Sequence, residues 1–175
     1  MRNCRFLFNF MSSFSRKNVY GGEVYEYMRD NSGLVRIQSP EAIDIETAIE
    51  RALRPHFRKS PPKSETAVQD SIETILNALG IDFRREKDTA PIGRRAFRPD
   101  FTVDNLSLAI EVKLATEKHS PSAIQEEIAA DITAYKTRWK HLLFVIYDTG
   151  VIADPYQMRR ENMRLFGVSV VIIKH

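Results

Sequence analysis

Three charged residues on two neighbouring predicted strands are the most informative feature of this sequence. Asp100 follows Pro99, and Glu111 and Lys113 lie within the mostly apolar stretch 107–114. Because side chains alternate along a strand, Glu111 and Lys113 project to one face while their aliphatic neighbours project to the other. Burying a carboxylate beside an ammonium group carries a substantial desolvation cost. Such a pair usually persists because it holds a metal ion or takes part in chemistry.

The chemistry that these residue types suit is phosphodiester hydrolysis with a divalent cation. Magnesium prefers carboxylate oxygens and keeps several waters, so Asp100 and Glu111 are expected to share one Mg²⁺, with Mn²⁺ as a substitute. The main-chain carbonyl of Val112 is a further oxygen ligand. Lys113 would orient the attacking water or stabilise negative charge on the phosphate. A plain buried ion pair between Glu111 and Lys113 is the structural alternative, but it leaves Asp100 unexplained.

The pattern around these residues predicts an α/β fold. Asp104 and Asn105 form a predicted tight turn, so the segments on either side of it should pair as an antiparallel hairpin that carries the charged residues. A near-continuous apolar run at 141–148 is typical of a strand covered on both faces. The predicted elements are a helix from Ser64 to Gly80, strands at 81–86, 97–103 and 107–114, a helix opened by Pro121, the strand 141–148, a helix at 155–165 and a strand at 167–173. The order αβββαβαβ indicates a mixed central sheet flanked by helices.

Residues 1–60 are expected to form an N-terminal arm and helix, and residues 61–175 the domain that carries the charged residues. The pattern predicts a hairpin within 23–38 and a helix at 41–58, with Ser39 as its cap and Pro40 at its first position. Residues 1–14 superficially resemble an export signal, but polar residues interrupt a very short apolar stretch. We interpret this segment as part of an arm that contacts a partner or a second copy of the chain.

The composition is that of a globular protein, with 175 residues, 43% hydrophobic and 28% charged, and a net charge of +3. No apolar run approaches the roughly 20 residues of a membrane span. The single cysteine, Cys4, excludes an intramolecular disulfide and a thiolate zinc site. These features favour a protein of a reducing compartment, the cytoplasm, with no membrane contact.

The motif and its context resemble the PD-(D/E)XK nuclease superfamily. Within it, residues 54–70, 109–114, 127–136 and 142–148 are similar to the nuclease domain of the DpnII/MboI restriction endonucleases, a similarity that spans about residues 50–150. The resemblance implies a restriction-endonuclease-like αβββαβ core with an N-terminal extension. It also implies a magnesium-dependent endodeoxyribonuclease of restriction or phage-defence type.

In that superfamily the first helix often adds an acid to the metal site. Glu65 and Glu73 are the candidates, and at 100° per residue Glu65 falls within the apolar face of the helix. We therefore expect Glu65 to join the site, although a first-turn acid also stabilises the helix dipole. Gln69, one turn later, is a candidate for contacting water or phosphate. Glu127 and Asp131 on the next long helix are interpreted as a solvated helix edge.

Basic residues are concentrated before Asp100. Residues 84–98 carry six Lys or Arg against two acids, and Arg94, Arg95 and Arg98 are the predicted nucleic-acid contacts. Clustered positive charge beside an acidic site suits a polyanion such as DNA.

The sequence thus predicts a DNA endonuclease that acts as a homodimer or as a subunit of a multi-protein defence complex. Cleaving both strands of a duplex needs two active sites, and residues 1–60 are short for a domain that recognises a target sequence. Two alternatives stay open. One is a structure-specific repair or junction nuclease, or an RNA nuclease. The other is a non-catalytic nucleic-acid-binding or assembly subunit with the same fold.

Overall fold

The computed structural model describes residues 13–16, 25–29, 35–38, 40–86, 98–162 and 165–175. Near the N-terminus, β1 (Ser13–Arg16), β2 (Tyr25–Arg29) and β3 (Val35–Gln38) form a three-stranded antiparallel sheet. The predicted hairpin at 23–38 is therefore confirmed as β2 and β3. Strand β1 was not predicted.

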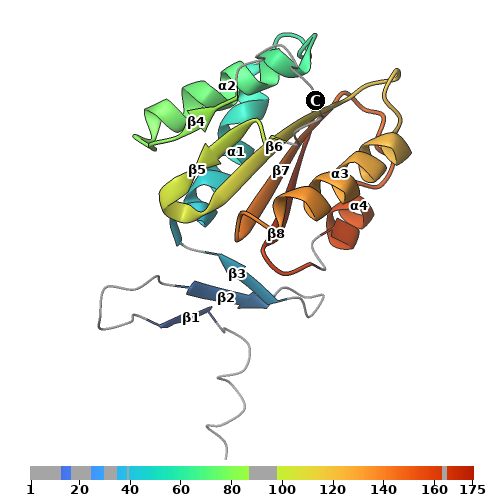
Figure 1. Cartoon of the computed structure of the whole chain (residues 1–175). Coiled ribbons are helices and arrows are strands. Elements are labelled where there is room, and N and C mark those ends of the chain that lie inside the picture. The colour runs from blue at the N-terminus through green and yellow to red at the C-terminus, as the bar shows by residue number, and fades with distance from the viewer. Residues whose placement is uncertain (1–12, 17–24, 30–34, 39, 87–97, 163–164) are drawn as a thin grey trace, which may run out of the picture.

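The larger sheet has five strands in the order β4-β5-β6-β7-β8 (Figure 1). Strand β5 runs antiparallel to both β4 and β6, whereas β6, β7 and β8 run parallel. The strands are β4 (Arg84–Arg85), β5 (Phe101–Val103), β6 (Leu108–Ala115), β7 (His141–Asp148) and β8 (Val168–Lys174). Every residue of β7 is buried, which confirms the prediction of a strand covered on both faces.

Helices cover both faces of this sheet. On one face lie α1 (Pro40–His56) and α2 (Glu65–Ala78), and on the other α3 (Pro121–Tyr135) and α4 (Pro155–Asn162) (Figure 1). Two hydrophobic clusters result, one on each side. Ile45, Ile49 and Leu53 of α1 pack into the same cluster as the apolar stripe of α2. The predicted α/β fold with a mixed sheet is confirmed.

The helices beside the charged residues begin and end where capping chemistry predicts. The Ser64 side chain accepts a hydrogen bond from the Ala67 N–H at 3.2 Å, and Gly80 follows α2 with a φ of +68°. Ser120 caps α3 in the same way, with Pro121 in its first turn. These caps fix the start of each helix relative to β6.

The hairpin differs from its prediction in detail. Strands β4 and β5 are shorter than predicted, and Asp100 lies just before β5 rather than on it. Pro99 has no N–H to donate to a ladder, and the Asp100 carboxylate itself takes a backbone N–H of β6. The connection is a turn of 3₁₀ helix, Asp104–Leu106, followed by Ser107 with a φ of +47°. The helix predicted at 155–165 ends at Asn162 among the described residues.

None of the helices within the described ranges has the length and hydrophobicity needed to cross a membrane.

Candidate active site

Strand β6 separates aliphatic from charged side chains, as its alternation predicts. Ile110, Val112 and Leu114 pack into the cluster beneath α1 and α2. Glu111 and Lys113 project to the face covered by α3, where the Lys113 Nζ lies 2.9 Å from the Glu111 Oε1. Their side chains are only 11% and 12% exposed, so this ion pair is largely removed from water.

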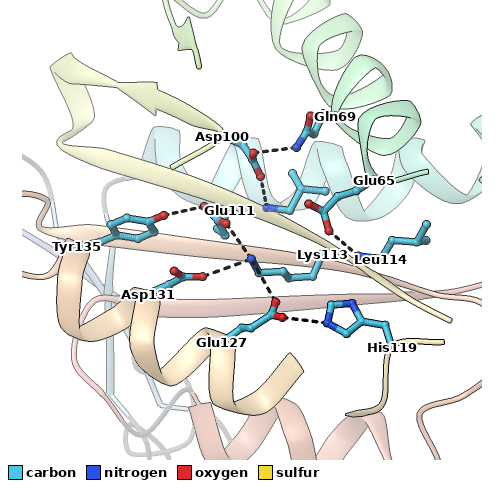
Figure 2. Close-up of polar contacts among 11 residues, drawn as sticks. Glu65, Gln69, Asp100, Glu111, Lys113, Leu114, His119, Glu127, Asp131 and Tyr135 are labelled. Atoms are coloured by element: carbon cyan, nitrogen blue, oxygen red, sulfur yellow. Dashed lines mark hydrogen bonds and ion pairs between the residues drawn. The ribbon is translucent and has the colours of Figure 1, made fainter. Parts of the chain in front are cut away.

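Asp100 joins this pair from the neighbouring segment (Figure 2). Phe101 pairs with Ile110, and continuing that register by one residue places Asp100 opposite Glu111. The Asp100 Oδ2 accepts a hydrogen bond from the Val112 N–H at 2.7 Å. The structure thus brings together the three residues that the sequence singled out.

Glu65, the first residue of α2, lies at the same edge of β6. Its Oε2 accepts a hydrogen bond from the Leu114 N–H at 3.2 Å. Strand β5 begins only at Phe101, so it offers no carbonyl to the Val112 and Leu114 N–H groups of β6. These two N–H groups donate to the carboxylates of Asp100 and Glu65 instead. In a sheet, the N–H and C=O of one residue point toward the same neighbour, so the Val112 carbonyl points to this edge as well.

Gln69 and Glu73 have different positions on α2. The Gln69 amide donates to the Asp100 Oδ1 at 2.8 Å. Its contact is therefore with the acidic cluster, which we define as Glu65, Asp100 and Glu111. Glu73 forms an ion pair with Arg85 instead. Of the two acids considered on this helix, Glu65 is the one that reaches the cluster.

Lys113 has further acidic partners on α3, which the sequence interpretation missed. Its Nζ lies 3.4 Å from the Asp131 Oδ2 and 3.6 Å from the Glu127 Oε2 (Figure 2). Asp131 is only 8% exposed, so interpreting it as a solvated helix edge was wrong. Burying the Asp131 carboxylate would be costly if the Lys113 ammonium group did not pair with it. Glu127 keeps more solvent contact, and its Oε1 lies 2.9 Å from the His119 Nε2.

Tyr135 is a second residue whose contact was not predicted. It lies on the apolar stripe of α3 and is buried, but its hydroxyl donates to the Glu111 Oε2 at 3.1 Å. A signal existed in the sequence. Tyr135 follows Asp131 by one helical turn, on a stripe otherwise made of isoleucines, and a buried tyrosine hydroxyl usually has a partner.

The electrostatics of the cluster reflect burial and mutual repulsion of its carboxyl groups. Burial, followed by the charge of Asp100, raises the pKa of Glu111 to about 8. Burial also raises the pKa of Asp100 to about 6, although the hydrogen bond from Val112 opposes that shift. Burial lowers the pKa of Lys113, but the hydrogen bond to Glu111 and the charges of Glu111, Asp131 and Glu65 together outweigh it, and the net shift is upward. Lys113 is therefore positively charged beside acids that bind protons more readily than free carboxyl groups do.

The donor chemistry of this cluster fits a hard cation. No group of three or more His, Cys, Asp or Glu side chains within the described ranges is arranged to hold a metal ion. Magnesium does not require such a group, because one or two carboxylates with waters and substrate oxygens suffice. Asp100, Glu111 and the Val112 carbonyl offer oxygens only, and a cation between the two acids would offset the repulsion that raises their pKa values.

The predicted nucleic-acid contacts are only partly described. Arg98 is exposed and forms an ion pair with Glu86. Arg94 and Arg95 lie outside the described residues.

Comparison with protein families agrees with the fold and the motif. Residues 50–175 match the family model described as REase_DpnII-MboI. Comparisons with curated proteins and with solved structures gave no match. The matched region runs from within α1 to the end of β8 and includes every residue of the acidic cluster. The members of this family are DNA endonucleases of restriction type. This chain belongs to the DpnII-MboI restriction endonuclease family.

Proposed function

We propose that this protein is a magnesium-dependent endonuclease that hydrolyses DNA phosphodiester bonds in restriction or phage defence. Family membership supports the substrate and the reaction class. The observation that carries the metal-dependent mechanism is the meeting of Asp100, Glu111 and Lys113 on one hairpin, with two acids and a lysine largely shielded from water.

In this proposal, Asp100, Glu111 and the Val112 carbonyl hold Mg²⁺, or Mn²⁺ in its place, and Glu65 is a further ligand at the same edge. A cation held there would supply Lewis-acid chemistry, a water of lowered pKa and a polarised phosphoryl oxygen. The hydrogen bonds from Gln69 and the Val112 N–H hold the Asp100 carboxylate in one orientation. The acidic oxygens are therefore positioned before the substrate arrives.

Lys113 supplies the positive charge for the phosphate. Its ammonium group would stabilise the negative charge that grows on the phosphoryl oxygens or orient the attacking water. Asp131 and Glu127 also lie near this ammonium group, so its position does not depend on Glu111 alone. Glu111 in turn keeps a hydrogen bond from Tyr135. Asp131 and Tyr135 thus act as positioning residues for the two groups that meet the substrate and the cation.

We further propose that the enzyme works in the cytoplasm as a homodimer or within a multi-protein defence complex. One cluster of catalytic residues cuts one strand, so a double-strand break needs a second copy. Residues 1–60 are the proposed contact for that copy or for a partner, and residues 61–175 the nuclease domain.

Plasmid cleavage tests the reaction. With Mg²⁺ we expect nicked and linear products, with EDTA none, and with Asp100→Ala or Lys113→Ala a loss of roughly a thousandfold or more. Lys118→Ala, an exposed lysine just beyond β6, is the matched control and should cleave normally. Activity that survives chelation or either substitution would exclude this mechanism. Cleavage confined to branched DNA or to RNA would keep the mechanism but change the substrate.

A further inference from the structure

A groove of about 820 Å³ lies beside the acidic cluster and has no assigned role. Its lining comes from β4, β5, the turn before β6 and the segment after α3. We call it the arginine groove, after the four arginines that line it, Arg84, Arg85, Arg98 and Arg138. Its size is within the roughly 300–1,000 Å³ of ligand-binding clefts.

Strand register places this groove on the face that carries Glu111 and Lys113. Arg84 pairs with Thr102, and Thr102 pairs with Ala109, so their side chains share one face of the sheet. Ala109 is two residues before Glu111 and packs in the cluster on the α3 side. Helix α3 packs against β6 and β7. The groove therefore lies over the adjoining strands, β4 and β5.

Two residues that line the groove adjoin residues of the proposed active site. Pro99, which lines it, directly precedes Asp100. Trp139, which also lines it, packs edge-on against Tyr135, with ring centroids 5.7 Å apart. The Tyr135 hydroxyl reaches Glu111. A polymer with one phosphate at the acidic cluster would extend into this groove.

The charges in the groove suit a phosphate backbone. Arg85 is neutralised on the α2 side by Asp70 and Glu73. The other three arginines face two acids, Glu86 and Asp104, which form exposed ion pairs with Arg98 and Arg84. Exposed ion pairs contribute little stability, so these arginines can exchange a carboxylate for a phosphate at small cost. The Arg138 guanidinium group lies 4.9 Å from the centre of the Trp139 ring, and this stacking orients it at the groove wall.

We propose that the arginine groove binds the phosphodiester backbone of the DNA next to the scissile phosphate, with Arg138 and Arg84 as its principal contacts. The proposal rests on the DNA endonuclease function above and adds to it the path of the substrate. Contacts of this kind position the duplex without reading its sequence. Each arginine that neutralises one phosphate contributes about 0.9 to the slope of log affinity against log salt.

The test is the binding of the full chain to a labelled duplex in EDTA across a salt series. Arg138→Ala should weaken binding about two- to fivefold and lower the salt slope by about 0.9. Arg84→Ala should have the same effect. Arg160→Ala is the matched control, because Arg160 also lies over an aromatic ring, that of Tyr156, but on α4, which packs against β8 at the far edge of the sheet. Its binding should equal that of the wild type.

A variant that is expected to bind DNA more tightly distinguishes the loss of a DNA contact from misfolding. Asp104→Asn removes the acid that competes for Arg84, so it should tighten binding and steepen the salt slope. A protein weakened by misfolding would not bind more tightly. If Arg138→Ala and Asp104→Asn both bind like Arg160→Ala, the groove is not the DNA path.

The outcome for the groove is distinguishable from that for the reaction. Wild-type cleavage that requires Asp100, together with unchanged binding by Arg138→Ala, would overturn the groove and leave the reaction intact. Binding that depends on Arg138 in a protein that never cleaves would overturn the reaction and leave the groove intact. If both hold, Arg138→Ala should raise the KM for DNA and leave kcat largely unchanged, since it contacts substrate away from the reacting phosphate.

Discussion

The two faces of β6 differ sharply in the side chains that they present. Toward α1 and α2, β6 presents Ile110, Val112 and Leu114 to a dry hydrophobic cluster. Toward α3 it presents Glu111 and Lys113, which contact Asp131, Glu127 and Tyr135. One strand thus anchors the sheet with one face and gathers the charged groups of the proposed site with the other.

This difference teaches how the fold can support a costly site. Burying several carboxyl groups and an ammonium group adds little net stability, because desolvation offsets their attraction. Packing of aliphatic side chains on the opposite face stabilises the same strand without desolvating any charged group. Function and stability should therefore be separable by substitutions at adjacent positions of β6.

The largest expected effect is on activity, from Glu111→Gln. Cleavage should fall by roughly a thousandfold or more, because the neutral amide is a poor ligand for a hard cation. Stability without metal should change little, because burial and the charge of Asp100 raise the pKa of Glu111 to about 8, so folding disfavours its carboxylate and gains little from that charge. Cleavage rates with Mg²⁺ and thermal unfolding in EDTA measure the two quantities. Early unfolding of this variant would show that the charged face also stabilises the fold.

The next effect is on stability, from Ile110→Ala on the opposite face. Ile110 is fully buried, and truncating it should lower the free energy of unfolding by about 2–4 kcal/mol. Chemical denaturation gives this value. Cleavage measured well below the melting temperature should be close to that of the wild type. A loss of activity comparable to that of Glu111→Gln would mean that the two faces are not independent.

A smaller effect is expected from Tyr135→Phe, which removes one hydrogen bond to Glu111 and keeps the ring packing on Trp139. Outer partners of metal ligands typically contribute about 10–100-fold in metal affinity or activity. The variant should need more Mg²⁺ for half-maximal cleavage, with about 1 kcal/mol or less lost in stability. Tyr156→Phe, at an exposed tyrosine of α4, is the control. Equal Mg²⁺ requirements for the two variants would assign Tyr135 a packing role only.

Local patterns in the sequence were enough to predict most of the fold and the centre of the site. Alternation identified β6, the apolar run identified β7, and Ser64 marked the start of α2. The contacts of Lys113 with Asp131 could not be predicted in this way, because they depend on how the crossover from β6 to β7 lays α3 over the sheet. The sequence pattern of α3 shows an apolar stripe beside acids and does not reveal that one of those acids is buried.

The lengths of β4 and β5 could not be predicted from the sequence pattern either, for a related reason. Side chains rather than a strand satisfy the Val112 and Leu114 N–H groups, and a propensity for extended structure does not distinguish these two solutions.

The 3₁₀ turn Asp104–Leu106 has a consequence for which changes of length the hairpin can accept. It sets the number of residues between Asp100 and Glu111, and strand register then places both carboxylates on the same face of the sheet. One inserted residue would shift the pairing by one position and rotate Asp100 to the opposite face. Surface turns generally tolerate insertions. This turn should accept many substitutions but no change of length, because its length sets the register that places Asp100 opposite Glu111.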